Sequence, residues 1–361
     1  MAYGDGAQLG YTSLLGISEE TTFGTHVTAS AFIEFNSESM AMNREEIKLE
    51  AINTSRNFKR RMYGNQSVEG TLEMDLNISS DPVVYLLKQA MGGTATADTV
   101  SSASSGAMKH TIAEGDMESN KSSGGAATVK SLGITVRKGG VVTVAGTITA
   151  SIFQYNGCRV NTLTISGEIG SPIKLSAGIV GQGGTASSDS LTASFTNTAP
   201  LHFDGVTFSS GDSIGNLSAE SIISFEMTLN NNIISDAAAR KLGSDKVQVL
   251  PPTRREISLA VTQRWDTTGN FSRFNSGSQN FAGTQMAFQI LLSSNQTIAS
   301  VLANSTISMH INLPNCRLNG PAVPEVGDVG VLTTDLEYSC LEDSATAYAI
   351  QMQVNNGTQT Y

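Results

Sequence analysis

The feature of this sequence that most constrains its fold is a recurring alternation of apolar and polar residues. In the segment 67–77, apolar side chains alternate with acidic and hydroxyl side chains at every second position. A period of two places the two kinds of side chain on opposite faces of an extended strand, so it predicts a half-buried strand. The pattern recurs at 163–166, 223–230, 256–262 and 332–338. The acidic residues on the predicted wet faces are Glu69, Glu73, Asp75, Glu226, Glu256, Asp335 and Glu337.

Helices are expected to be few. Asp81-Pro82 has the residues of a helix N-terminus, and Gly92-Gly93 has those of a helix end. Further short helices are expected at 235–242 and 297–303. Charged residues make up 15% of the chain, where about a quarter is usual, and small polar residues take their place. The sequence therefore predicts an all-β protein with a minor helical part.

Two turn-rich stretches suggest how the chain is divided. Residues 92–128 are rich in Ser, Gly, Ala and Thr and predict a long surface loop around one short strand at 109–113. Residues 181–189 are similar and lie near the middle of the chain, so they predict a linker. We expect a first domain over residues 1–185, which carries the Gly/Ser-rich insertion, and a second domain over residues 186–361.

A weak internal repeat links the two expected domains. Residues 156–161 (Asn-Gly-Cys-Arg-Val-Asn) are similar to residues 314–319 (Pro-Asn-Cys-Arg-Leu-Asn). Each half also holds a long strand, a polar loop and a Glu-containing strand, although the spacing differs between the halves. A duplication with loops of unequal length explains both observations. The alternative is that any β-sandwich contains similar hairpins.

Charge and cysteine content exclude several classes of protein. The net charge is −10, whereas a sequence-specific DNA-binding protein carries a basic face. Cys158, Cys316 and Cys340 form no CxxC pair and are expected to be free thiols in a reducing compartment. No stretch resembles a signal peptide or reaches the roughly 20 apolar residues of a membrane span. We expect synthesis in a bacterial cytoplasm and no membrane partner.

Motifs for catalysis and cofactor binding are weak. The four histidines have no zinc-type spacing. Residues 211–215 match Gly-x-Ser-x-Gly, but the sequence around them does not predict the required strand and helix. The Gly-rich segment 178–183 precedes no helix that could bind a phosphate. The sequence therefore predicts no enzyme, no cofactor and no metal site.

One cluster of basic residues lies in the loop between two acidic strands. It consists of Arg56, Lys59, Arg60 and Arg61. A solvated loop would explain it. The functional alternative is a contact with an acidic surface of a neighbouring subunit, which opposite charges would orient.

Several segments, taken in their order along the chain, resemble the major tail tube proteins of siphophages, the phages with long non-contractile tails. No single motif is diagnostic, but the resemblance covers nearly the whole chain. The segments are 14–25 (Leu-Leu-Gly-Ile-Ser-Glu-Glu-Thr-Thr-Phe-Gly-Thr), 67–74 (Ser-Val-Glu-Gly-Thr-Leu-Glu-Met), the helix at 81–92, 155–165 (Tyr-Asn-Gly-Cys-Arg-Val-Asn-Thr-Leu-Thr-Ile), 224–232 and 251–262.

This resemblance implies β-sandwich or partial-barrel domains, each with a flanking helix, that polymerise as stacked rings. The inner sheets of neighbouring subunits would join around a channel through which DNA passes without specific binding, and a long hairpin loop would reach the next ring. The implied partners are further copies of the chain, a tape-measure protein, a tail-tip initiator complex and a tail terminator, all in the virion tail. Together with the repeat, the resemblance predicts two tandem tube domains and three chains in each pseudo-hexameric ring.

The acidic strand residues given above are then candidates to line the channel, although they would also be exposed in a protein without one. The loops 51–66 and 234–252 are candidates for contacts between rings. Their basic residues are Arg56, Lys59, Arg60, Arg61, Arg240 and Lys241. The alternative from a different class is a carbohydrate-binding or adhesive β-sandwich module, which solvent-facing aromatic residues gathered on one sheet would favour.

Overall fold

The structure is a computed structural model of the whole chain. It describes residues 9–29, 31–52, 56–93, 95–99, 108–117, 130–142, 148–187, 191, 194–195, 198–265, 268–275, 285–297, 306–320, 323–324, 326 and 329–356. These residues form 19 strands and two α-helices, so the predicted all-β class with a minor helical part is confirmed.

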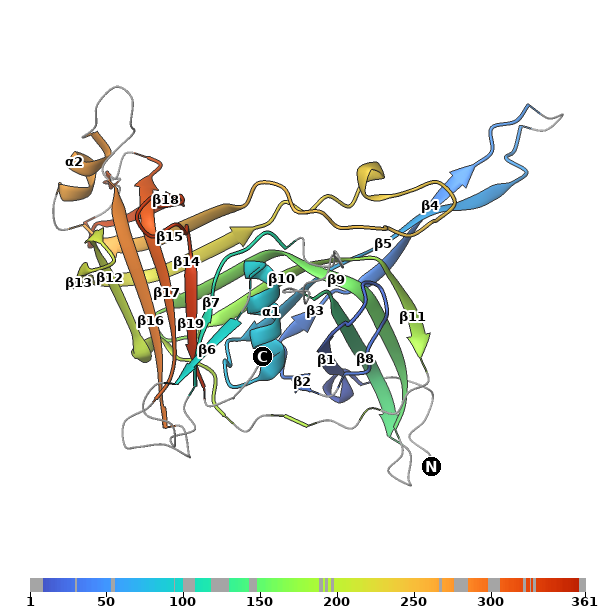
Figure 1. Cartoon of the computed structure of the whole chain (residues 1–361), viewed down its shortest axis with the longest axis horizontal. Coiled ribbons are helices and arrows are strands. Elements are labelled where there is room, and N and C mark those ends of the chain that lie inside the picture. The colour runs from blue at the N-terminus through green and yellow to red at the C-terminus, as the bar shows by residue number, and fades with distance from the viewer. Residues whose placement is uncertain are drawn as a thin grey trace.

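One long antiparallel sheet, here called the main sheet, runs through both halves of the chain (Figure 1). Each strand pairs with the next in the following order. β3 (Ser37–Glu38) and β4 (Ala41–Lys48) both pair with β5 (Arg61–Asp75), and then come β10 (Lys174–Gly181), β9 (Ile148–Glu168), β14 (Ile222–Asn230), β15 (Glu256–Arg264) and β18 (Thr333–Cys340).

A second layer in the first half packs against one face of the main sheet. Its strands are β2 (Phe32–Ile33), β1 (Leu14–Glu19), β8 (Leu132–Val142), the first part of β9, and β11 (Gly183–Ser187). Helix α1 (Asp81–Met91) packs against β9 and β1. The helix begins at Asp81 with Pro82 in its first turn, and Gly92 ends it in a left-handed conformation with φ 68°, as the sequence predicts.

The second half has a corresponding layer. Its strands pair in the order β13 (Asn216–Ala219), β12 (Val206–Ser213), β16 (Met286–Thr297), β17 (Thr306–Leu318), β19 (Gln351–Asn355), β7 (Met108–Ile112) and β6 (Ala95–Thr99). The last two strands come from the insertion of the first half. The second half also holds helix α2 (Gly269–Asn275) and 3-10 turns at Phe203–Gly205 and Ala237–Ala239; a third turn, Gly10–Thr12, precedes β1.

Two long strands take part in both layers. β9 pairs with β8 and β11 before Cys158 and with β10 and β14 after it. Gly157 supplies the bend with φ 61°, a conformation that other residues rarely adopt. β17 likewise pairs with β16 and β19 along most of its length and with β18 from Cys316.

Apolar residues on the inner face of the main sheet form one core that continues through both halves. Leu72, Ile165, Met227, Leu259 and Leu336 belong to the same buried cluster. They occupy the apolar positions of the alternating segments, so the pattern correctly predicts which face is buried.

Several sequence-based predictions need correction. The segment 235–242 contains only the 3-10 turn Ala237–Ala239, because its backbone hydrogen bonds go to a distant part of the same loop. β5 begins at Arg61, so 61–66 is strand and not loop. In the expected surface insertion, the short strand predicted at 109–113 is present as β7, but it pairs with a second strand, β6. The expected linker carries β11, and Thr297 ends β16. The remainder of the third expected helix lies outside the described residues.

Candidate functional surfaces

The seven acidic residues chosen from the alternation all lie on the outer face of the main sheet. Six of them are exposed and Asp75 is half-buried. The strand register places Ala260 between Glu226 and Glu337, so these two carboxylates share one row across the sheet. Asp335 accepts a hydrogen bond of 2.7 Å from the Thr262 hydroxyl. The structure therefore brings together on one surface residues that are far apart in the sequence.

The outer face is acidic beyond these seven residues. Glu168 lies on it beside Ser224. On the paired strands of this face within residues 67–339, the basic residues that reach solvent are Lys174, Arg264 and Arg317. Acidic residues thus outnumber basic ones, and a polyanion near this face would be repelled and not bound.

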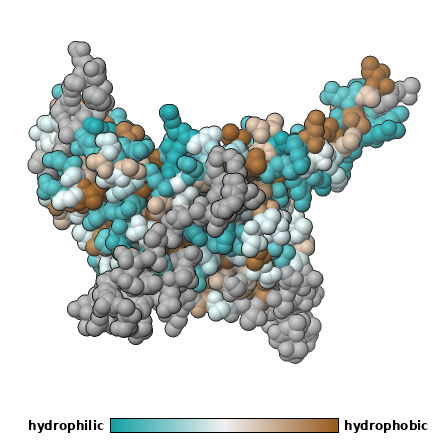
Figure 2. Space-filling model, in the orientation of Figure 1, coloured by the Kyte–Doolittle hydropathy of each residue, from teal (hydrophilic) through white to brown (hydrophobic). Residues whose placement is uncertain are grey.

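A hairpin, here called the arm (residues 44–65), extends β4 and β5 away from the body of the molecule (Figure 1). Figure 2 shows hydrophobic and hydrophilic side chains mixed along it. The exposed apolar side chains on the described part of the arm are Ile47, Leu49, Ile52, Phe58, Met62 and Tyr63. All four residues of the basic cluster are also on the arm and exposed. Arg61 and Glu46 lie 3.7 Å apart, but an exposed pair of this kind adds little stability.

The corresponding loop of the second half, here called the strap (residues 231–255), lies across the first half of the same chain. The Asn231 amide donates to the carbonyl oxygens of Ala90 and Val160, at 2.9 and 3.1 Å. Arg255 donates to the carbonyl oxygens of Met91 and Gly115, at 2.9 and 2.7 Å. The bonds to Ala90 and Met91 join the strap to the last carbonyl groups of α1, of which Met91 also accepts from the Gly115 backbone N–H at 3.0 Å.

The middle of the strap buries apolar side chains. Ala239, Val247 and Leu250 form a cluster that packs against Phe23 and Val180 of the first half. The Gln182 amide donates to the Val247 carbonyl oxygen at 2.8 Å.

The tip of the strap, around residues 240–245, contacts the base of the arm. Arg44 of the arm forms an ion pair with Asp245 of the strap at 2.5 Å. Arg240, a predicted contact residue, donates to the Gln66 carbonyl oxygen at 3.0 Å within its own chain, whereas Lys241 is exposed.

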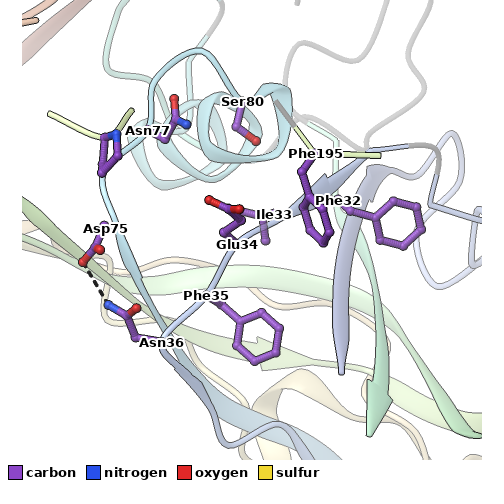
Figure 3. Close-up of a pocket in the computed structure, with 10 residues that line it drawn as sticks. Phe32, Ile33, Glu34, Phe35, Asn36, Asp75, Asn77, Ser80 and Phe195 are labelled. Carbon is purple, nitrogen blue, oxygen red and sulfur yellow. Dashed lines mark hydrogen bonds between the residues drawn. The ribbon is translucent and has the colours of Figure 1, made fainter. Parts of the chain in front are cut away.

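A cleft lies beside the β3 end of the main sheet (Figure 3). It is bounded by the connection that follows β2, by Asp75 and Asn77 after the end of β5, and by Phe195 and Pro200. The Asn36 amide donates to Asp75 at 2.9 Å across its rim. Asn77 is bonded to both the carbonyl oxygen and the hydroxyl of Thr198. These contacts hold the edge of the sheet in place and assemble no catalytic group.

Other residues considered from the sequence lie apart. The Gly-x-Ser-x-Gly segment forms the turn between β12 and β13, a hairpin and not a strand–helix elbow. Among the described residues, no three His, Cys, Asp or Glu side chains are grouped to hold a metal ion. Cys316 and Cys340 are cross-strand neighbours with sulfurs 3.1 Å apart. Burial raises the pKa of the Cys316 thiol well above its ordinary value, and contact with Cys340 raises it further.

Two features escaped prediction from the sequence. One is the docking of the strap, which uses backbone carbonyls that carry no sequence signature. The other is Glu20, a buried carboxylate that accepts hydrogen bonds from Gly24, Gly157 and Ser131. The only sign of Glu20 in the sequence is an acidic residue that closely follows the apolar residues Leu14, Leu15 and Ile17.

The described residues thus form an all-β protein with an acidic sheet face and a projecting hairpin that exposes apolar side chains. A family model described as phage tail tube protein matches residues 10–340, and the chain belongs to this family. It is therefore a structural subunit of a phage tail tube, which self-assembles into a tube in the virion tail. No curated protein matches the sequence. Within the described residues, no helix is both long and apolar enough to cross a membrane.

Proposed function

We propose that this protein forms stacked rings of three chains whose outer main-sheet face lines a channel for DNA during ejection from a siphophage. The gathering of Glu69, Glu73, Asp75, Glu226, Glu256, Asp335 and Glu337 on one continuous sheet face carries this proposal. Phosphates in the channel would meet like charge, so DNA would slide without binding.

The correspondence between the two halves supports a pseudo-sixfold ring. β8 and β9 pair as β16 and β17 do, and both long strands change layers at Cys158 and Cys316. β5 pairs with β10 as β15 pairs with β18. We therefore treat residues 1–185 and 186–361 as two tube domains, with residues 92–128 as an insertion in the first.

The edges of the main sheet support closure of the ring. In the register of the two halves, the segment 37–43 corresponds to 224–230 of β14, which pairs with β9. Among the described residues, 37–43 pairs with β5 only. Unpaired edges favour addition of a further strand, and the next chain would provide it from the segment that follows β17. Val323 and Val326 in that segment are exposed.

Contacts between rings would come from the tips of the arm and the strap. Arg56, Lys59, Arg60, Arg61 and Lys241 are exposed there, and Arg240 positions the strap tip against the first half. The further partners would be a tape-measure protein, a tail-tip initiator complex and a tail terminator. Synthesis would take place in the cytoplasm of the bacterial host.

Electron microscopy of the purified protein at high concentration tests the proposal. Hollow tubes with three chains in each ring, pseudo-sixfold end views and the acidic sheet face toward the lumen are expected. Rings of six whole chains would overturn the fused-domain count, and tubes with this face toward the outside would overturn the channel lining.

A further inference from the structure

We infer that the arm docks on the second half of the neighbouring chain in the same ring, on the surface around Asn319, Ser339 and Leu341. This inference rests on the proposed ring, and for the arm it replaces the contact between rings given above with a contact inside one ring. The occupant is a second copy of this chain, and the strap on its own first half shows how such a hairpin is held.

The strand register defines which residues correspond. Val180 pairs with Arg159 on one side and with Glu69 on the other. Ser339 pairs in the same way with Arg317 and Ser258. Gln182, whose amide donates a hydrogen bond to the strap, therefore corresponds to Leu341. Asn161 corresponds to Asn319.

The hairpins themselves correspond as well. Ala41 is opposite Glu69 in the first half, and Thr228 is opposite Ser258 in the second. The chain between each pair differs by only two residues in length. Phe58 lies as far before Glu69 as Val247 lies before Ser258, so the arm carries Phe58 where the strap carries its buried Val247.

The arm carries an exposed apolar side chain at the position where the strap carries a buried one, because Val247 lies in the apolar cluster of the strap. Val247 is 0% exposed, whereas Phe58 is 61% exposed and Leu341 is 48% exposed. In the strap, the backbone carbonyl of Val247 accepts a hydrogen bond from the Gln182 amide, so the backbone at position 247 lies beside the side chain at position 182. The same arrangement between chains would place Phe58 beside Leu341 and remove apolar surface of both side chains from water, which favours association.

The polar contact at the base of the hairpin also has a counterpart. Asn161 accepts hydrogen bonds from the backbone N–H groups of Asn231 and Ile233, each at 2.8 Å. Asn319 is exposed and its Oδ1 accepts from the Ser339 hydroxyl at 2.8 Å. It therefore lies at the surface, where an arriving hairpin can reach it.

Charge complementarity favours the same occupant. The arm has the exposed cations Arg56, Lys59, Arg60 and Arg61, which lie close to Phe58 in sequence. Glu337 and Glu342 are exposed on β18 and directly beyond it, on either side of Leu341 along the chain. Opposite charges across an interface increase the rate and specificity of association.

A cysteine pair distinguishes contact within a ring from contact between rings. Phe58→Cys combined with Leu341→Cys is assembled into tubes and oxidised by air with a copper catalyst. If the contact lies within closed rings, most chains should become cross-linked into products with the mass of two or three chains. No larger product is expected. The single variants are the controls, and they also report any participation of Cys340.

A ladder of products beyond three chains would show that the arm reaches the next ring, and tubes without cross-links would show that it docks elsewhere; either result overturns the inference. If the double variant does not assemble, wild-type tubes are treated with a carbodiimide, which joins amines to carboxylates. A Lys59–Glu342 link between chains is expected, and linkage of Lys59 only to other surfaces overturns the inference. A failure of the wild-type protein to form any tubes would count against the proposed function instead.

Discussion

At the scale of single residues, Glu20 connects three parts of the chain that are distant in sequence. One carboxylate oxygen accepts hydrogen bonds from Ser131 and Gly24, at 2.7 and 2.9 Å, and the other accepts from Gly157 at 3.0 Å. Gly157 is the bend where β9 changes layers. The carboxylate therefore fixes the position of the corner on which both sheets of the first half depend.

The variant Glu20→Gln tests this role. A glutamine cannot accept at both oxygens, so one of the three donors loses its partner. We expect the free energy of unfolding to fall by about 1–3 kcal/mol, the usual cost of a buried unsatisfied polar group. Urea unfolding of the monomer measures it; an unchanged midpoint would contradict the role.

The same residue predicts a dependence of stability on pH. Burial raises the pKa of the Glu20 carboxyl above its ordinary value of 4.5, against the opposing effect of its three hydrogen bonds. The folded protein therefore holds this proton more tightly than the unfolded chain does. The Glu20 contribution to stability is present below pH 4.5 and is lost as the pH rises through the higher folded-state value. Across that pH interval, the urea midpoint of Glu20→Gln should fall less with rising pH, or rise more, than the midpoint of the wild-type protein. Parallel pH profiles for the two proteins would contradict the prediction.

Cysteine reactivity gives a second residue-scale prediction. Burial raises the pKa of the Cys158 thiol well above its ordinary value of 9.0, and Glu20 adds to the effect. Since the thiolate is the reactive form, iodoacetamide at neutral pH should leave Cys158 unmodified in the native monomer and modify it in urea. Mass spectrometry of peptides measures this, and rapid native labelling would contradict the buried position.

At the scale of secondary-structure elements, the arm and the strap are similar hairpins in different states. The strap is held on its own chain by its apolar cluster and by Arg255, while the arm is joined to the strap at its base through Arg44 and exposes Phe58 further along. A charge on the arm should therefore affect assembly and not folding.

The variant Phe58→Asp tests this separation. Phe58 is exposed, so the melting temperature of the monomer should stay unchanged, because surface substitutions usually alter stability by less than about 0.5 kcal/mol. Tube formation should be lost or need a much higher protein concentration, as measured by sedimentation. Ile169→Asp is the matched control, since Ile169 is an exposed apolar residue in the turn between β9 and β10, outside both hairpins. Normal tubes from Phe58→Asp would show that the arm carries no assembly contact.

At the scale of the whole molecule, the sign of charge on the main-sheet face should control DNA passage. Glu226→Lys combined with Glu337→Lys places two cations in one row of the proposed lumen. Tubes should form normally, but DNA ejection should slow and regain speed as salt is raised, because phosphate contacts weaken with salt. Asp212→Lys, in the exposed turn between β12 and β13, is the control. Unchanged ejection by the double variant would mean that the face does not line the channel.

The sequence was sufficient for the parts of this fold that depend on local periodicity. Alternation at 67–77, 223–230, 256–262 and 332–338 correctly predicted strands and their buried faces, and the caps of α1 were read from Pro82 and Gly92. The helix expected at 235–242 was wrong because tertiary contacts of the strap override local preference. The placement of β7 beside β19 and of Asn231 beside Ala90 could not be predicted, since these contacts join segments more than a hundred residues apart.

The insertion in the first half makes the two halves unequal. Its strands β6 and β7 extend the second half through β19, and the described residues place no such pair on β11 of the first half. A ring of three chains would then carry the β6–β7 pair at three positions around its circumference and not at six. A ring stacking on it would find three equivalent rotational settings, separated by thirds of a turn, so the helical twist of the tail would inherit the periodicity of the whole chain and not that of the repeated domain.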